Sequence, residues 1–237
     1  MRALISTLER IQRPIDFFVR DDDAGWNDVA LGKLVAIFQD VGLPIDLAAI
    51  PAAFDPATAR ALVDLVNRHP HIGVHQHGYC HQNHEPEGER KCEFGSTRPM
   101  NRQLADVIAG RNRLQQLMDG IALDPIFTPP WNRCSAELGA SLHQHGFAML
   151  STDRFRNDVG TEIIQLPVML DWERARRERR LAESFVTAIN GADGPIGLML
   201  HHGVMDDDGR AELRTTLDIL TANPHVRFRP MRYWIGE

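Results

Sequence analysis

The sequence predicts a single α/β domain over residues 1–237 whose strands form a closed or nearly closed β/α barrel. Short β-rich runs alternate with helix-patterned runs along the chain, and such alternation indicates parallel strands joined by right-handed crossovers. Seven or so such units suit a barrel, and an open doubly wound sheet is the alternative. No glycine-rich phosphate loop follows the first strand, where the sequence reads RDDDAGW, and this argues against a nucleotide-binding unit.

The first half of the chain is expected to hold three strands separated by two capped helices. Asn27 and Asp28 supply capping chemistry for the first helix, and Gly42 is placed to end it. The dipeptide Asp55-Pro56 begins the second helix, with Asp at the cap and Pro in the first turn. The predicted strands are residues 16–20, 45–50 and 71–75.

A long polar stretch interrupts the alternation at residues 78–98. Loops of this length within a compact domain are usually functional or disordered, so we expect this insert to lie near a site. The Arg-rich run at residues 173–180 is interpreted as a salt-bridged helix face rather than a phosphate site, because glutamates are interleaved in it. Beyond the insert, the predicted helices are residues 104–117, 135–145, 172–190 and 210–221, and the predicted strands are residues 124–128, 147–151, 162–166, 195–200 and 226–228.

Composition and charge argue against several classes of protein. The chain is 43% hydrophobic and 24% charged, as in ordinary soluble domains, and its net charge of −6 disfavours nucleic acid and anionic membranes. No apolar run approaches the roughly 18 residues that a membrane span needs. Glu9 and Arg10 occupy the place of a signal peptide's apolar core, and the three cysteines are sparse. We therefore expect a cytoplasmic protein with no nucleic-acid or membrane partner.

Carboxylates and imidazoles follow three separate predicted strands. In a β/α barrel the C-terminal ends of the strands meet at one face, and that face holds the active site. These side chains are therefore expected to converge. They are Asp21, Asp22 and Asp23 after the first strand, His75, His77 and His81 after the third, and His201 and His202 after residues 195–200.

The histidines are concentrated near this expected site, since six of the 11 fall within residues 69–84. His77 and His81 are spaced i, i+4, so one helical turn would project both rings to one side, where they can share a cation. With an Asp from another strand, this set predicts one divalent metal ion, most simply Zn²⁺, with Fe²⁺, Co²⁺, Ni²⁺ and Mn²⁺ also compatible. A structural zinc site using Cys80 and Cys92 is the alternative, although these cysteines lack the usual paired spacing.

The other polar residues suggest proton-transfer groups. Consecutive carboxylates raise one another's pKa unless a cation is near, so Asp22 and Asp23 are interpreted as a base and a metal ligand. A solvated Asp-rich turn is the simpler alternative. His201 and His202 end a buried strand, and one of them is interpreted as a general acid. Because neighbouring residues of a strand point to opposite faces, only one of the two can face the site.

Four segments, FVRDDDAG, HGYCH, FTPPWN and LMLHHG, resemble the ordered motifs of the polysaccharide deacetylase family, the NodB-homology or family 4 carbohydrate esterases. The resemblance implies a distorted (β/α)7 barrel and one divalent metal. By this resemblance, the metal ligands of the family correspond to Asp23, His77 and His81. The resemblance also implies Asp22 as the catalytic base, although a slip of one residue would give the pair Asp21 and Asp22. It implies His201 as the catalytic acid, with His202 as the second candidate.

The chain departs from the family pattern in its third motif and in its insert. The family usually carries an Arg that orients the base, whereas this chain has Thr128, and Arg20 or Arg133 could take over that contact. The dipeptide Asp171-Trp172 resembles the fourth motif in content. The polar insert at residues 78–98 is unusual for the family and indicates a less characterised branch.

The resemblance implies a metal-dependent deacetylase acting on non-peptide carbon–nitrogen bonds. The expected substrate is an N-acetylated sugar or a related small molecule. Pro130, Trp131 and Trp172 are predicted to contact it as stacking surfaces or pocket walls, although the aromatic residues could equally belong to the core. A metal-dependent phosphoesterase and a non-catalytic barrel that binds sugar or metal are the alternatives.

Overall fold

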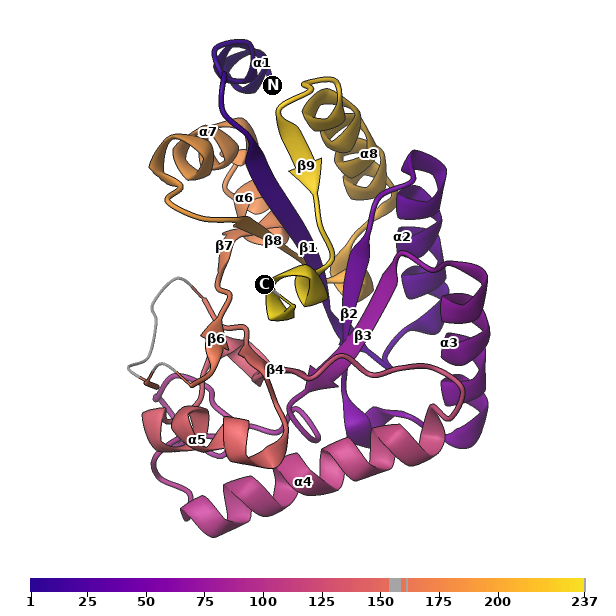
Figure 1. The fold of residues 1–237 in the computed structure, drawn as a ribbon, viewed down its shortest axis with the longest axis vertical. Helices are drawn as coiled ribbons and strands as arrows, with labels where there is room; N and C mark the ends of the chain where they lie inside the picture. The colour runs from indigo at the N-terminus through magenta and orange to yellow at the C-terminus, as the bar shows by residue number, and fades with distance from the viewer. Residues whose placement is uncertain (154–158, 161, 237) are drawn as a thin grey trace.

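The computed structural model describes residues 1–153, 159–160 and 162–236, and its parallel strands curl into a partly open barrel (Figure 1). The order of strands is β6-β5-β4-β3-β2-β1-β8-β7, with β9 also paired to β1. The late strand β8 thus pairs with the first strand, as a barrel requires, and the sheet is open between β6 and β7. The strands are β1 Ile15–Ala24, β2 Ile45–Ala49, β3 Ile72–His77, β4 Ile126–Thr128, β5 Met149–Leu150, β6 Ile164–Gln165, β7 Val168–Asp171, β8 Ile196–Leu200 and β9 Val226–Phe228.

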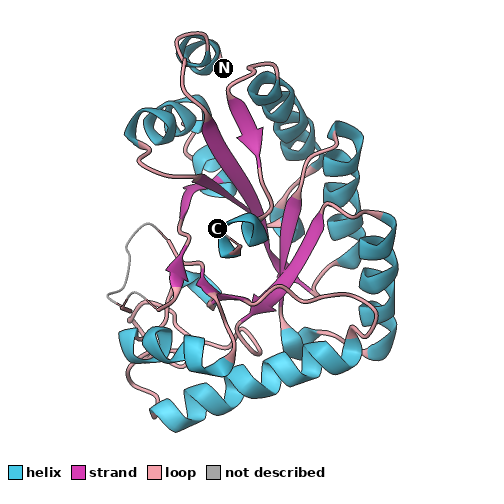
Figure 2. Ribbon diagram, viewed as in Figure 1, coloured by secondary structure: helices cyan, strands magenta, loops and turns pink. Residues whose placement is uncertain are grey.

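Helices cover the outside of the curled sheet (Figure 2). Several of them begin at a side-chain cap: at the start of α3, Asp55 Oδ1 accepts hydrogen bonds from the backbone N–H groups of Ala57 and Thr58, both at 2.8 Å. Their apolar faces pack with the outer face of the strands in the largest hydrophobic cluster. The helices are α1 Arg2–Leu8, α2 Asp28–Val41, α3 Pro56–Arg68, α4 Met100–Leu117, α5 Ala136–Ser141, α6 Trp172–Arg177, α7 Leu181–Gly191 and α8 Asp207–Thr221.

The C-terminal 3₁₀ helix, Met231–Ile235, lies inside the ring of strands (Figure 1). Met231 is fully buried, and Trp234 packs edge-on against Phe18 of β1, with ring centroids 5.8 Å apart. The backbone N–H of Met231 donates to Asp46 Oδ2 near the start of β2, at 2.9 Å. This segment fills the N-terminal end of the barrel, so the opposite end is left for the site.

Most predicted elements are present, and three local expectations are wrong. The helix predicted at residues 172–190 is two helices, because Arg179 adopts a left-handed conformation with φ 56° between α6 and α7. The short strand β7 was not expected. The segment HGYCH is not a helical turn, since Gly78 and His81 have φ 55° and 57°. Among the described helices, none is both long enough and apolar enough to cross a membrane.

Candidate metal centre

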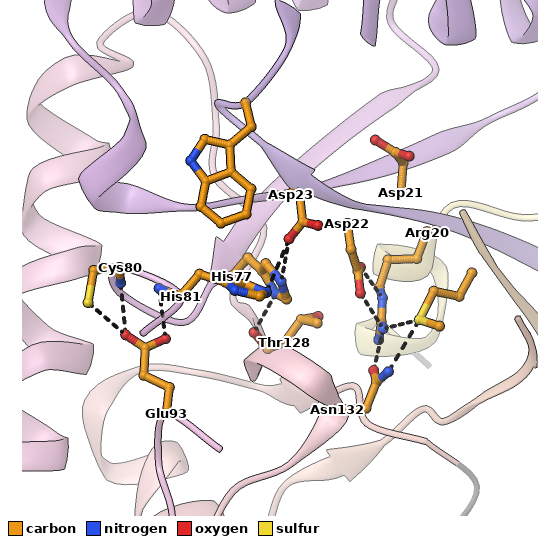
Figure 3. A network of polar contacts seen from close by, with 12 residues as sticks. Arg20, Asp21, Asp22, Asp23, His77, Cys80, His81, Glu93, Thr128 and Asn132 are labelled. Atoms are coloured by element: carbon orange, nitrogen blue, oxygen red, sulfur yellow. Dashed lines mark hydrogen bonds and ion pairs between the residues drawn. The ribbon is translucent and has the colours of Figure 1, made fainter. Parts of the chain in front are cut away.

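Asp23, His77 and His81 meet at the C-terminal end of the barrel (Figure 3). One ligand atom from each residue lies within 4.8 Å of the others. The carboxylate oxygen Oδ1 of Asp23 is 3.3 Å from Nε2 of both histidines. This oxygen is buried and has no hydrogen-bond partner. An oxygen and two ring nitrogens that face one another in this way fit a divalent cation.

His77 is held in the orientation that a metal ligand needs. It is the last residue of β3, and its ring is almost fully buried. Its Nδ1 lies 3.0 Å from the carbonyl oxygen of Thr128 at the end of β4. Because a carbonyl can only accept, Nδ1 carries a proton, and Nε2 is the ring atom that faces Asp23 and would bind a metal.

Asp22 is paired with Arg20 two residues earlier on β1. Arg20 has no exposed surface, and its Nε and Nη2 donate to the two oxygens of Asp22 at 2.7 and 3.0 Å. Further bonds to Ser151 Oγ at 2.8 Å and Asn132 Oδ1 at 2.5 Å fix the guanidinium in place. Burial alone would raise the pKa of Asp22, but the charges of Arg20, His77 and His201 together outweigh it and lower the pKa to about 2.

Of the two arginines considered in the sequence for a contact to Asp22, Arg20 is the one that makes it. Thr128 in the third motif lies with its Oγ1 2.9 Å from Nε2 of the buried His75. Burial, and then the charge of Arg20, lower the pKa of His75 to about 3, so this ring is neutral. Arg133 points elsewhere and donates to the carbonyl of Lys91 at 3.1 Å. Sequence reasoning offered Arg20 and Arg133 equally, because only the fold decides which side chain reaches Asp22.

Asp21, next to Asp22 on β1, binds a different partner, His202. Its two oxygens accept from the backbone N–H of His202 at 2.9 Å and from ring Nδ1 at 2.6 Å. Ring Nε2 of His202 lies 2.6 Å from the carbonyl oxygen of Trp26. Both contacts need an N–H donor. Burial alone would lower the pKa of His202, but these acceptors outweigh it and raise the pKa to about 9.

The neighbouring His201 is partly exposed at the end of β8, and its charge acts to lower the pKa of both Asp21 and Asp22. Both ring nitrogens of His202, by contrast, are occupied in the buried pair with Asp21. Of the two predicted acid candidates, the geometry therefore favours His201.

Two tryptophans flank the ring of His81. Trp131 lies with its ring centroid 4.4 Å from that of His81, and Trp26, which is 44% exposed, lies at 5.1 Å. Trp131 holds this place with a left-handed φ of 55°, a strained conformation that is often found at functional sites. Both indoles are thus placed to contact a molecule bound at the metal site.

The predicted substrate contacts of Trp172 and Pro130 are not supported by their positions. Trp172 has no exposed surface and packs in the largest hydrophobic cluster, because it follows β7 and faces the helices. Pro130 is buried, and its ring lies where a side chain at Gly78 would be. The Arg-rich run forms ion pairs as expected, among them Arg174 with Glu178 at 2.9 Å.

Among the described residues, Asp23, His77 and His81 are the only metal-ligating cluster of three. The alternative zinc site built on cysteines is not formed, since the thiol of Cys80 instead donates to Glu93 Oε1 at 3.2 Å.

The sequence matches no family model and no curated protein, whereas many solved structures resemble this one. A Mycobacterium smegmatis protein assigned to the polysaccharide deacetylases has a TM-score of 0.68 at 16% identity, covering 96% of this chain and 91% of its own. The family 4 carbohydrate esterase of Streptomyces lividans has a TM-score of 0.55 at 15% identity, covering 90% of both chains. A family 4 pseudoenzyme of Bacillus anthracis has a TM-score of 0.61 at 10% identity, covering 94% of this chain and 66% of its own. The chain therefore has the fold of the family 4 polysaccharide deacetylases, a distorted (β/α)7 barrel.

Proposed function

We propose that this protein is a metal-dependent hydrolase that removes an acetyl or similar acyl group from an amide, such as an N-acetylated sugar or a related small molecule. The observation that carries the proposal is the convergence of Asp23, His77 and His81 beside a second carboxylate, Asp22, that is held separately by Arg20. One carboxylate is thereby available to a metal while the other is kept for proton transfer. The shared fold with deacetylases is consistent with this division of roles.

Three protein ligands would leave at least one coordination position of the metal open for water or substrate. When bound, a divalent metal supplies Lewis acidity, which polarises a carbonyl group and makes water more acidic. Zn²⁺ is the first candidate for a set of two imidazoles and one carboxylate, and Fe²⁺, Co²⁺, Ni²⁺ and Mn²⁺ accept the same donors. His77 and Asp23 present their ligand atoms without rearrangement, because each is fixed on its own strand.

Asp22 is the proposed proton acceptor for the attacking water. The ion pair with Arg20 keeps the Asp22 carboxylate ionised and fixes its orientation. Because the ion pair also lowers the pKa of Asp22, it makes the carboxylate a weaker base. His201 is the proposed donor of a proton to the leaving amine. Trp131 follows two prolines, which lack backbone N–H groups, so its own N–H is the proposed donor to the oxyanion that forms on the substrate carbonyl.

The proposal is tested by assaying acetylated amino sugars and small amides with and without added Zn²⁺ or Co²⁺, together with the variant Asp22→Asn. We expect turnover that requires the metal and one metal ion bound per chain. Asp22→Asn should retain the metal and lose turnover by about 10²–10⁴-fold, because only the proton acceptor is removed. The matched control is Asp193→Asn, which changes an exposed loop carboxylate far along the chain.

Each other outcome identifies a different function. Two metal ions per chain with hydrolysis of phosphate esters would indicate the phosphoesterase. Stoichiometric metal binding without turnover on any amide would indicate a non-catalytic barrel that binds sugar or metal. Full activity in Asp22→Asn would remove this residue from the proton-accepting role.

A further inference from the structure

Glu93 lies in the insert at residues 78–98 and faces the backbone of the turn that carries His81 (Figure 3). It has no exposed surface. Its two carboxylate oxygens accept hydrogen bonds from three successive backbone N–H groups. These are the N–H groups of Tyr79 at 3.3 Å, Cys80 at 2.8 Å and His81 at 3.2 Å.

The charge of Glu93 is compensated by these groups rather than by a cationic side chain. A carboxylate that accepts several backbone N–H bonds in a concave turn is a known arrangement for anions. The thiol of Cys80 adds a further donor at 3.2 Å. Arg98, which is nearby, donates to the backbone carbonyl of Glu93 at 2.9 Å and forms its ion pair with Asp106 at 2.6 Å. The Arg98 guanidinium therefore binds the backbone of residue 93, and, among the residues that the structure describes, the Glu93 carboxylate is bound only by the groups of the turn.

The turn that Glu93 binds is strained. His81 has a φ of 57°, in the left-handed region that non-glycine residues rarely adopt. Gly78 also has a positive φ of 55°, and a Cβ there would collide with the Glu93 carboxylate and with Pro130. A turn of this shape points its successive N–H groups inward, and it persists only when a neighbouring group binds them.

We propose that Glu93 is a positioning residue that holds His81 in its metal-binding orientation before the metal arrives. The inference rests on the proposed metal site. It connects the insert to the site: the carboxylate fixes the backbone of residues 79–81, and that backbone directs the His81 ring to within 3.3 Å of Asp23. His77 needs no such help, because it is part of β3.

The experiment compares Glu93→Gln with wild type in Zn²⁺ affinity, measured by competition with a chromophoric chelator. We expect the affinity to fall about 10–100-fold, since loss of an outer contact to a ligand has that effect. Glu89→Gln is the matched control, because it removes one negative charge from an exposed position of the same insert. Its affinity should equal that of wild type.

A second comparison separates positioning from mere stabilisation of the insert. In a His81→Ala background, Glu93→Gln should leave the remaining Zn²⁺ affinity unchanged, because the ligand through which it acts is gone. An equal loss in both backgrounds would show that Glu93 supports the whole site and would overturn the inference. Wild-type affinity in the single variant would also overturn it. Absence of Zn²⁺ binding by the wild-type protein would instead contradict the proposed function.

Amide hydrogen exchange on the metal-free wild-type protein tests the inference without any variant. If Glu93 sets the turn in advance, the amides of Tyr79, Cys80 and His81 should exchange at least 10²-fold more slowly than in an unstructured peptide. Protection of these amides only after Zn²⁺ is added would show that the metal, and not Glu93, orders the turn. This measurement decides the question even if Glu93→Gln does not fold.

Discussion

Buried carboxylates occur at both ends of the barrel, and their surroundings differ. At the C-terminal end, Asp22 faces the Arg20 guanidinium and Asp21 faces the His202 imidazolium. At the N-terminal end, the carboxyl groups of Asp46 and Asp124 both lie where a side chain at residue 73 would be, and glycine there leaves them room. Asp46 accepts one hydrogen bond from the N–H of Met231, and its other oxygen has no partner.

The difference shows what keeps a buried acid ionised. Burial raises the pKa of Asp46 to about 7, and the nearby carboxyl of Asp124 adds to the effect, so the group holds a proton near neutrality. Asp22 is equally buried, yet its pKa is lowered to about 2, because Arg20 meets both of its oxygens. Of these two fully buried carboxyl groups, only Asp22, which meets a guanidinium, therefore stays fully ionised near neutral pH.

The largest expected effect comes from removing the cation at the C-terminal end. Arg20→Met should lower the free energy of unfolding by about 3–5 kcal/mol, because it leaves Asp22 buried without a partner. Urea unfolding at neutral pH measures the change. The double variant Arg20→Met, Asp22→Asn should recover much of the loss, since the unpaired charge is then gone.

Arg10→Met, at an exposed position, is the control for Arg20→Met and should change stability by less than about 0.5 kcal/mol. A loss below about 1 kcal/mol in Arg20→Met would mean that water or another group compensates Asp22. The difference in pKa between Asp22 and Asp46 would then have a cause other than Arg20.

A smaller effect should distinguish the two adjacent histidines. His202→Gln should lose about 1.5–3 kcal/mol of stability, because the charge-assisted hydrogen bond from its ring Nδ1 to Asp21 is lost. His201→Gln should keep wild-type stability and lose turnover by about 10²-fold, because only the proposed proton donor is removed. Urea unfolding and steady-state kinetics on both variants measure this. If the two variants exchanged phenotypes, the assignment of the acid to His201 would be wrong.

The last effect concerns Asp46 and appears only as a pH dependence. Its pKa rises from an ordinary 3.8 to about 7 on folding, so its contribution to stability is complete below pH 3.8 and is lost as the pH rises through about 7. Within that window the loss is at most about 1.4 kcal/mol per pH unit. Asp46→Asn should remove this part of the pH dependence, whereas Asp64→Asn on the exposed face of α3 should retain it. Parallel stability curves for wild type and Asp46→Asn between pH 4 and pH 8 would contradict the prediction.

Much of the site could be predicted from the residues that follow each strand, because parallel strands of a barrel all end at the same face. That inference needs only the order of strands and helices along the chain. Asp23, His77 and His81 meet as the barrel topology requires. The pairing of Asp21 with His202 was beyond that inference, since it depends on how the residues that follow β8 lie against β1. A run of three acidic residues carries no sign of that pairing.

Local conformation around the site was harder to predict. The i, i+4 spacing of His77 and His81 suggested a helical turn, but the backbone there is set by Glu93, which comes twelve residues after His81. The only feature of the sequence that suggested a buried role for Glu93 was its place between two apolar residues, Cys92 and Phe94. Trp172 was misplaced for a related reason, because its sequence neighbourhood resembled a site motif and the unexpected strand β7 turned it toward the core.

The pairing of the first strand with the last has a consequence for the newly made chain. Residues Ile15–Phe17 of β1 bind Val226–Phe228, and the accompanying ion pair of Asp16 with Arg227 joins residues 211 positions apart. A chain still on the ribosome therefore has an open edge on β1 until β8 has emerged, and the Ile15–Phe17 end stays open until residues near 228 follow. Such an edge invites pairing with other chains, so this protein should depend on chaperones during translation more than after release.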